Sequence, residues 1–362
     1  MPATALNGVC PYYTMYPLDF PLRVLARTGK IGEWVLDPFC GRGTTNFAAR
    51  LLGMPSVGVD SSPVAAALAK AKILHASPAR VIASLKAILA EVRYPSDVPT
   101  GPFWELAFHE KTLGELCRLR EGLLADCSSS TRILLRAIIL GALHGPRPKG
   151  KPSYFSNQSP RTFAPKPKYA VKFWTERNLR PEAVDVAAII RTRAERYLAE
   201  ALPKVEGTIR LADSREPETF RRMPKASWIV TSPPYYGMRT YVPDQWLRHW
   251  FLGASENVEY RYPGTQIEHT GAAHFSSEMA RVWINVGRNS VSSARLIIRF
   301  GGIHDRDAEP MDILRDSLAN SGWVIVTTKS VPDADTGRRQ VRQFQAKPRK
   351  GVIEHDVYCR RA

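Results

Sequence analysis

Two short apolar segments, each ending in an aspartate and separated by a glycine turn, constrain the possible folds of this chain most strongly. Residues 34–37 read WVLD, PFCGRGTT follows, and a helix-like run extends from residue 46 to residue 52. The segment 55–60 reads PSVGVD, a second short strand that ends in Asp60. Glycines allow a backbone to approach a ligand closely, and a helix N-terminus offers free N–H groups. The pattern predicts a nucleotide-binding βαβ unit in which Asp60 accepts hydrogen bonds from ribose hydroxyls.

A second constraint is the sequence TSPPY at residues 231–235, directly after the apolar run 228–230. Proline has a fixed φ and no N–H, so nearby carbonyl oxygens are free to accept hydrogen bonds from a substrate amine. The ring of Tyr235 can stack on a planar base. Pro-Pro-Tyr also occurs in exposed linkers, but here it lies between a buried-looking strand and the aromatic-rich segment 236–251. The pattern favours methylation of an exocyclic amino group on a nucleobase.

The sequences DPFCGRGTT at 37–45 and TSPPY at 231–235 resemble the two main motifs of the DNA amino-methyltransferases, which use S-adenosyl-L-methionine. The resemblance covers residues 12–75 and 205–330. It implies a Rossmann-like class I methyltransferase fold, an α/β fold with a mostly parallel twisted sheet and a largely helical insert. Family members with Ser-Pro-Pro-Tyr are mostly cytosine-N4 enzymes, whereas those with Asp or Asn in place of the serine are mostly adenine-N6 enzymes. Ser232 therefore favours cytosine N4 in DNA.

The resemblance also implies the organisation of the chain and the residues of its site. Residues 1–100 would form the cofactor-binding half of the core and 205–362 the catalytic half, with a basic C-terminal segment. Helical periodicity in the segments 103–143 and 181–202 predicts that 101–204 is a helical insert with a basic and aromatic loop, a candidate for target recognition. Further strands are expected at 209–214, 294–300 and 323–328. The catalytic residues would be Ser232, Pro233, Pro234 and Tyr235. The cofactor pocket would be formed by Thr14, Asp37, Phe39, Gly41, Gly43, Thr44, Asp60, Ser61 and Asp213.

The mechanism follows from these residue types. The lone pair of the cytosine amine is delocalised into the ring, which makes the amine a poor nucleophile. Hydrogen bonds from the amine to the Ser232 hydroxyl and to the Pro233 carbonyl would favour a tetrahedral nitrogen that attacks the sulfonium methyl in line. A target base within a duplex would have to be flipped out, and Tyr235 would receive it face-on.

The charge of the chain favours a nucleic-acid partner, and double-stranded DNA is expected. The sequence has 51 Lys+Arg against 34 Asp+Glu, a formal charge of +17. Between residues 144 and 180 basic and aromatic residues alternate, with Glu176 as the single acid, and this segment looks too broken for a regular helix. It could grip phosphates and stack on bases, or it could be a solvated linker. The predicted DNA-binding residues are Arg147, Lys149, Lys151, Asn157, Arg161, Lys166, Lys168, Arg239, Arg338 and Arg339.

Several classes of function fit the sequence poorly. None of the five cysteines follows a proline, as the nucleophile of ring-carbon methyltransferases does, and no Cys-x-x-Cys pair exists. The histidines lack metal-ligand spacing, so no metal is expected. No apolar run is long enough to span a bilayer, no signal peptide is recognisable, and the scattered cysteines suit a reducing cytoplasm. We expect a cytoplasmic prokaryotic protein that acts on the nucleoid, for which the family implies a cognate restriction endonuclease as a candidate partner.

Three alternative functions stay open on the sequence. An adenine-N6 methyltransferase would share nearly every feature except Ser232. An RNA base methyltransferase would keep the same fold and could use the same basic segment. A non-catalytic nucleic-acid-binding protein could retain the fold, although the glycine turn and the TSPPY loop are both intact.

Overall fold

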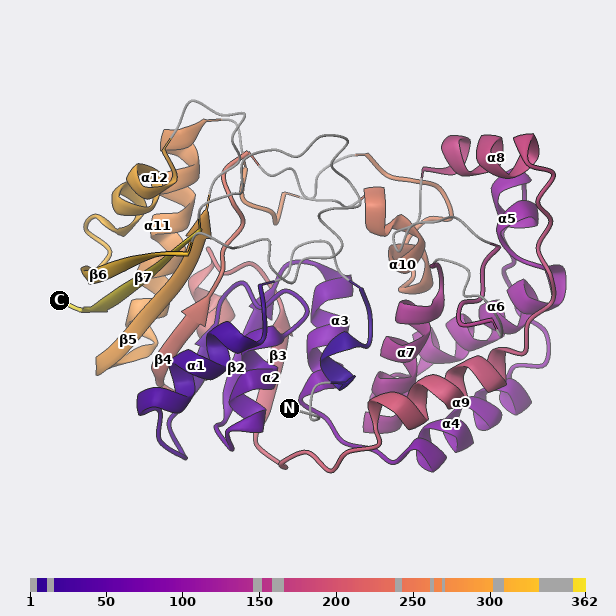
Figure 1. Ribbon diagram of the computed structural model, residues 1–362, viewed down its shortest axis with the longest axis horizontal. Coiled ribbons are helices and arrows are strands. Elements are labelled where there is room, and N and C mark those ends of the chain that lie inside the picture. The colour runs from indigo at the N-terminus through magenta and orange to yellow at the C-terminus, as the bar shows by residue number, and fades with distance from the viewer. Residues whose placement is uncertain are drawn as a thin grey trace. The chain divides into compact units, whose positions relative to one another are not determined.

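The computed structural model describes residues 5–11, 16–145, 152–157, 166–237, 243–260, 264–268, 271–301, 309–331 and 354–362. The chain divides into two compact units. The sheet unit comprises residues 13–69, 203–240 and 262–362, and the helical unit comprises residues 1–12, 70–202 and 241–261 (Figure 1).

A seven-stranded sheet organises the sheet unit. Its strands lie in the order β3 (Gly207–Leu211), β2 (Ser56–Asp60), β1 (Val35–Asp37), β4 (Ala226–Thr231), β5 (Ser290–Gly301), β7 (Glu354–Arg361) and β6 (Trp323–Val331). The first five are parallel, whereas β7 runs antiparallel to both of its neighbours. This arrangement confirms the Rossmann-like class I methyltransferase fold and the strands expected from the sequence.

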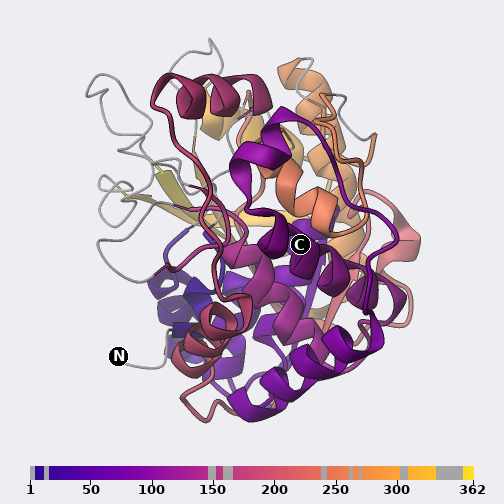
Figure 2. The same ribbon diagram turned by 90° about the vertical axis from the view of Figure 1, so that its right-hand side faces the viewer.

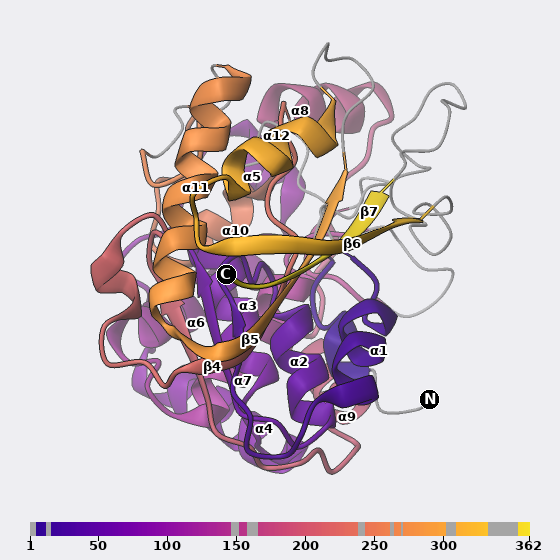
Figure 3. The ribbon, with the colours of Figure 1, turned by 90° about the vertical axis from the view of Figure 1, so that its left-hand side faces the viewer.

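Helices cover both faces of this sheet (Figure 3). On one face lie α1 (Asp19–Thr28) and α2 (Thr44–Leu51), and on the other lie α11 (Ala272–Arg288) and α12 (Pro310–Leu318). Alternate residues of one strand therefore enter different cores: Val230 packs towards α1 and α2, while Ile229 packs towards α11. Because both faces are buried, the inner strands are continuous apolar runs rather than alternating ones.

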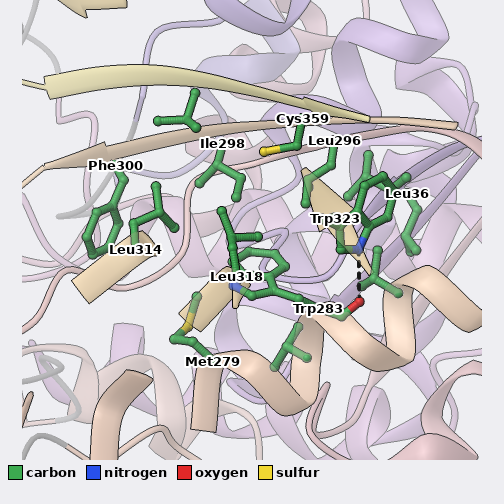
Figure 4. Packing of buried hydrophobic residues seen from close by; sticks show 14 of the residues in the cluster. Leu36, Met279, Trp283, Leu296, Ile298, Phe300, Leu314, Leu318, Trp323 and Cys359 are labelled. Carbon is green, nitrogen blue, oxygen red and sulfur yellow. Dashed lines mark hydrogen bonds between the residues drawn. The ribbon is translucent and has the colours of Figure 1, made fainter. Parts of the chain in front are cut away.

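The larger core lies between the sheet and helices α11 and α12 (Figure 4). Trp283 of α11 and Trp323 of β6 meet there, and the indole N–H of Trp323 donates to the Trp283 carbonyl oxygen at 3.0 Å. The indole N–H of Trp283 donates in turn to the Ser317 hydroxyl at 3.1 Å. These bonds satisfy the polar atoms of two buried tryptophans and join β6 to both helices.

The helical unit contains α4 (Pro78–Glu91), α5 (Pro102–Ala107), α6 (Glu110–Ala125), α7 (Ser130–Ala142), α8 (Pro167–Glu176), α9 (Val186–Tyr197) and α10 (Trp246–Phe251) (Figure 2). Two short 3₁₀ turns, Ala5–Gly8 and Pro243–Gln245, also belong to it. Side chains of Ser77, Ser129 and Asp185 cap the N-termini of α4, α7 and α9. Helix α4 packs against α6, α7 and α9. The remaining helix, α3 (Pro63–Lys72), crosses the boundary between the units in sequence.

The helical unit is larger than the predicted insert 101–204. Helix α4 belongs to it because its buried face, including Ile88, packs on α6 and α7 rather than on the sheet. Residues 241–261 belong to it because Trp246 and Trp250, four positions apart on α10, both contact Trp104. These two tryptophans therefore share one face of α10.

The basic segment 144–180 also differs from the prediction, since part of it is a regular helix. Helix α8 spans Pro167–Glu176, with Pro167 in its first turn, where a missing N–H costs nothing. Its inward face is held by Ala170 and Trp174, which are one turn apart and buried. Tyr169, Val171 and Phe173 lie outside this buried stripe, so the helical period is hard to see in a sequence that is also rich in proline and lysine.

Candidate active site

Three adjacent strands of the sheet end in polar residues at the same edge. Asp37, Asp60 and Thr231 are the last residues of β1, β2 and β4. Ligands of open α/β sheets bind at the carboxyl ends of the strands. The Thr231 hydroxyl donates to Asp37 Oδ1 at 2.6 Å, although the two residues are 194 positions apart. The fold thus brings together the glycine turn and the TSPPY loop, as the sequence predicted.

The glycine turn needs its glycines for conformation and for space. Gly41 and Gly43 have φ values of +50° and +76°, a region that L-residues with side chains rarely adopt. A Cβ atom on Gly43 would lie 2.8 Å from the Cα of Ala69, so α3 leaves no room for one. Thr44 begins α2 directly after this turn and is buried. Cys40 is buried beside Gly58, which fits a packing role.

Asp37 is a fully buried carboxylate with several hydrogen-bond donors. It accepts bonds from the Phe39 N–H at 3.1 Å and the Tyr16 hydroxyl at 3.3 Å, in addition to that of Thr231. Tyr16 also hydrogen-bonds Thr45. Desolvation nevertheless outweighs these bonds and raises the pKa of Asp37 to about 6. Burial, and then the charge of Asp37, raise the pKa of Tyr16 well above its ordinary value.

Asp60 ties the glycine turn to the end of β2. Its two carboxylate oxygens accept from the N–H groups of Gly41 and Ser62, both at 2.8 Å. Desolvation raises the pKa of Asp60 to about 6, against the effect of these two bonds. A carboxylate has about four acceptor sites. Asp60 can therefore hold the loop and still accept hydrogen bonds from ribose hydroxyls.

The other predicted cofactor residues vary in placement. Phe39 is half-buried, and its ring lies edge-on to Trp283 with centroids 6.1 Å apart. Ser61 is half-buried next to Asp60. Thr14 lies outside the described residues.

Asp213 is held by an arginine that sequence reasoning did not single out. Arg215 Nε donates to both carboxylate oxygens of Asp213 at 3.0 Å, and Arg215 Nη2 lies 2.6 Å from Asp213 Oδ2. Arg215 also pairs with Glu278 of α11 and donates to the Gly264 carbonyl oxygen at 2.7 Å. Hydrogen bonds to Asp213, and then to Glu278, raise the pKa of Arg215. A contact of Asp213 with adenine would have to share the carboxylate with Arg215.

The TSPPY loop places the side chains of Ser232 and Tyr235, two of the predicted catalytic residues, differently. Ser232 and Pro234 are half-buried, whereas Pro233 is buried. Tyr235 is only 7% exposed, and its ring lies edge-on to Phe300 with centroids 5.5 Å apart. The Tyr235 hydroxyl donates to Glu354 Oε1 of β7 at 2.7 Å. The ring expected to stack on a base is thus packed into the core and fixed at its hydroxyl end.

Five residues that shape the site were not among the predicted ones. They are Tyr16, Thr45, Arg215, Glu354 and Thr231, of which Thr231 was noted only as part of its motif. Thr45 lies just after the glycine turn in sequence, so its polar character was a usable signal, whereas Tyr16 lies 29 positions before Thr45 and meets it only in the fold. No signal in the sequence indicated Glu354, because this residue is 119 positions from Tyr235 and only the pairing of β7 with β5 brings the two together.

The predicted DNA-binding residues divide into three groups. Lys166 and Lys168 are exposed at the start of α8. Asn157 is buried and donates from Nδ2 to the Leu106 carbonyl oxygen at 3.0 Å, so it is a packing residue of the helical unit rather than a reader of base edges. The rest lie outside the described residues: Arg147, Lys149, Lys151, Arg161, Arg239, Arg338 and Arg339.

Helix α8 carries an outward face of cations and one aromatic ring. Lys166, Lys168 and Lys172 are exposed, and Tyr169 is 51% exposed. Lys166 lies over the ring of Tyr260, with Nζ 5.6 Å from the centroid. Such a face fits a phosphate backbone, because lysines neutralise phosphates and an exposed ring can stack on a base.

Within the described ranges, no group of histidine, cysteine, aspartate or glutamate residues could hold a metal ion. The five cysteines are free thiols. Among those same residues, no helix is both long and apolar enough to cross a membrane.

Comparison with known proteins supports the DNA methylase family for the N-terminal part of the chain. Residues 6–71 match the family model described as DNA methylase. A stretch of 45 residues is 42% identical to the Type II methyltransferase M.MthZI of Methanothermobacter thermautotrophicus, and covers 12% of this chain and 13% of that protein. The chain thus matches only about an eighth of that relative's length.

Two solved structures are also similar to this chain. TrmN from Thermus thermophilus has a TM-score of 0.35 and 11% identity, with 95% of this chain and 48% of that chain covered. The rRNA methyltransferase aviRa from Streptomyces viridochromogenes has a TM-score of 0.36 and 14% identity, with 99% and 93% covered. At these TM-scores the assignment of the fold rests on the strand order described above.

Proposed function

We propose that this protein is a DNA methyltransferase that transfers a methyl group from S-adenosyl-L-methionine to an exocyclic amine, with cytosine N4 as the target. The hydrogen bond between Thr231 and Asp37 carries the proposal, because it fastens the TSPPY loop to the strand that begins the glycine turn. Amine methylation needs these two elements side by side, since the methyl group and the amine must be close to contact.

The residues at the strand ends fit the proposed cofactor. The glycine turn leaves its backbone open, with no heavy atom within 4 Å of a Cβ built on Gly41. Asp37 and Asp60 bring two carboxylates to the same edge, which suits a ligand that carries a sulfonium and an ammonium group. When bound, S-adenosyl-L-methionine supplies an electrophilic methyl group. Asp60 would bind the ribose hydroxyls, and Phe39 would flank the adenosine.

Ser232 and Pro233 would prepare the amine. An amine N–H donates to the Ser232 hydroxyl and the other N–H to the Pro233 carbonyl, which draws the nitrogen out of conjugation with the ring. No covalent bond to the enzyme forms, and once the methyl group has transferred, the nitrogen gives up one proton to water. Ser232 is the single residue that favours cytosine over adenine, so adenine N6 is the principal alternative target.

Mass spectrometry of nucleosides tests this proposal. Double-stranded DNA and a matched RNA duplex are incubated with the protein and labelled S-adenosyl-L-methionine, and the labelled nucleoside is identified. N4-methylcytosine in DNA is expected. Labelled N6-methyladenine would show that adenine N6 is the target instead of cytosine N4. Label in RNA alone would show that RNA is the substrate instead of DNA. If neither substrate is labelled, the proposed function is wrong.

Two variants separate catalysis from cofactor binding. Ser232→Ala and Tyr235→Ala are expected to lower methyl transfer about 100-fold or more, because each removes a contact to the reacting base. Affinity for S-adenosyl-L-methionine, measured by calorimetry, should stay within about threefold of the unmodified protein, since neither side chain belongs to the glycine turn. Unchanged turnover in both variants would remove the loop from the mechanism.

A further inference from the structure

Next to the TSPPY loop lies a buried cluster of charges on β5 and β7. Glu354, Asp356 and Arg299 are 0%, 3% and 4% exposed. Arg299 forms a two-pronged ion pair with Asp356, with Nε–Oδ1 and Nη2–Oδ2 distances of 2.7 and 2.8 Å. The Arg299 guanidinium also lies 4.0 Å from the ring centroid of Phe20. Arg23 Nη2 also lies 3.8 Å from Asp356 Oδ2, so this carboxylate pairs with two cations.

Glu354 is the second carboxylate of this cluster. Its Oε2 is 3.9 Å from Arg299 Nε, a longer separation than any in the Arg299–Asp356 pair. Its Oε1 accepts the 2.7 Å hydrogen bond of the Tyr235 hydroxyl. A buried carboxylate costs several kcal/mol, and replacing buried charges by apolar residues is often neutral or stabilising, so stability alone is a weak reason for this glutamate.

The position of Glu354 in the sheet connects it to the site. It is the first residue of β7 and pairs with Gly301, the last residue of β5. Since β7 is antiparallel to β5, the start of β7 lies at the edge where the parallel strands end. The glutamate thus reaches the TSPPY loop from the C-terminal strand, whereas Thr231 anchors the same loop to β1.

We propose that Glu354 is a positioning residue of the TSPPY loop, which fixes the ring of Tyr235 by accepting the hydrogen bond of its hydroxyl. The inference rests on the proposed function, in which Tyr235 receives the target base. Core packing, including the edge contact with Phe300, places the ring of Tyr235, and the hydrogen bond at its hydroxyl adds a directional restraint on the plane of that ring. A preorganised ring lowers the ordering cost of placing the base beside the methyl donor.

Steady-state kinetics of four variants tests the role of Glu354. Glu354→Ala and Tyr235→Phe each remove the hydrogen bond and are expected to lower kcat about 10- to 100-fold, the range for a bond to a charged group. Glu354→Gln keeps an acceptor oxygen and should retain kcat within about threefold. The double variant Glu354→Ala/Tyr235→Phe should be no slower than Glu354→Ala alone within about threefold, because both changes remove one interaction.

Two controls separate positioning from structural damage. His355→Ala alters the next residue of β7, which is half-buried and lies on the opposite side of the strand, and it should leave kcat unchanged. All variants should bind S-adenosyl-L-methionine within about threefold of the unmodified protein, which shows that the sheet edge is intact.

Distinct results would overturn the inference and the proposed function. Full activity in Glu354→Ala would exclude a positioning role while leaving methyl transfer in place. Losses that multiply in the double variant would show that Glu354 and Tyr235 act independently, and would also overturn it. Absence of methyl transfer by the unmodified protein would instead refute the proposed function.

Discussion

At the scale of single residues, the burial of a side chain affects the chemistry of the site more than the type of residue does. Asp37 accepts hydrogen bonds from Thr231, Phe39 and Tyr16 and is still harder to ionise than a carboxylate in water, because it has lost its hydration. Tyr235 is fixed between Phe300 and Glu354, so its ring packs in the core and is also a candidate contact for a base. Neither property can be derived from the motifs alone.

The raised pKa of Asp37 predicts a pH-dependent stability. Its pKa is about 6 in the fold against an ordinary value of 3.8, so the folded state binds the proton more tightly. The loss of stability that comes from ionising the buried Asp37 is absent below about pH 4, grows as the pH rises, and is complete above about pH 6. Asp37→Asn lacks this titration, so its free energy of unfolding relative to the unmodified protein should increase by about 1–3 kcal/mol between pH 4 and pH 7.

Denaturant unfolding of both proteins at the two pH values measures this difference. Comparing the proteins at each pH cancels the titration of groups that do not interact with Asp37. Asp60 does interact with it, because the charge of Asp37, in addition to desolvation, helps to raise the pKa of Asp60. Removing that charge lowers the pKa of Asp60 and changes the difference between the proteins in the same direction. The hydrogen bonds lost in Asp37→Asn change the free energy of unfolding by the same amount at both pH values. A difference that does not change with pH, or that decreases as pH rises, would contradict the raised pKa.

At the scale of elements, the glycine turn is defined by the helix packed behind it. Gly43 precedes α2 with φ of +76°, and the backbone of Ala69 in α3 occupies the place of a side chain. Gly53, directly after α2, has nearly the same φ, +71°, but nothing within 4 Å of a built Cβ. The two glycines differ only in the space beside them.

This difference makes a matched pair of substitutions. Gly53→Ala should cost about 1–2 kcal/mol of unfolding free energy, the strain of a side chain at positive φ. Gly43→Ala should cost at least about 1 kcal/mol more, because the new methyl group must displace α3, and it should weaken binding of S-adenosyl-L-methionine as well. Denaturant unfolding and calorimetry check both effects. Equal losses in the two variants would show that the contact with α3 is not limiting.

At the scale of the whole molecule, the formal charge of +17 should make binding to nucleic acid strongly dependent on salt. The logarithm of the affinity is expected to fall linearly with the logarithm of salt concentration, by about 0.9 for each phosphate contacted. If the exposed face of α8 provides three of these contacts, the variant Lys166→Gln/Lys168→Gln/Lys172→Gln should reduce the slope by about 2–3. Filter binding to duplex DNA over a range of salt concentrations measures the slope.

A second triple variant controls for charge alone. Arg80→Gln/Lys86→Gln/Lys111→Gln removes three exposed cations from α4 and α6 of the same unit. Its slope should stay within about one unit of the unmodified protein, provided that α8 is the contacting surface. Equal reductions in both variants would mean that net charge, and not α8, governs binding.

The sequence by itself determined the strands of the sheet other than β7, the glycine turn and the TSPPY loop. Strands buried on both faces are continuous apolar runs, and the residues that end them obey local constraints on φ and hydrogen bonding. The bounds of the helical unit were missed, because whether α4 and α10 pack on helices or on the sheet depends on partners distant in sequence. Helix α8 was missed because only Ala170 and Trp174 mark its inward face.

Only the tertiary structure decided how the predicted residues are held. It paired Thr231 with Asp37 and Glu354 with Tyr235, and it paired Arg215, the neighbour of Asp213, with Glu278. It also buried Asn157, which the sequence had placed at a surface. The physical reason is that local geometry is encoded in neighbouring residues, whereas desolvation and long-range hydrogen bonds exist only once strands from distant parts of the chain meet at one edge of the sheet.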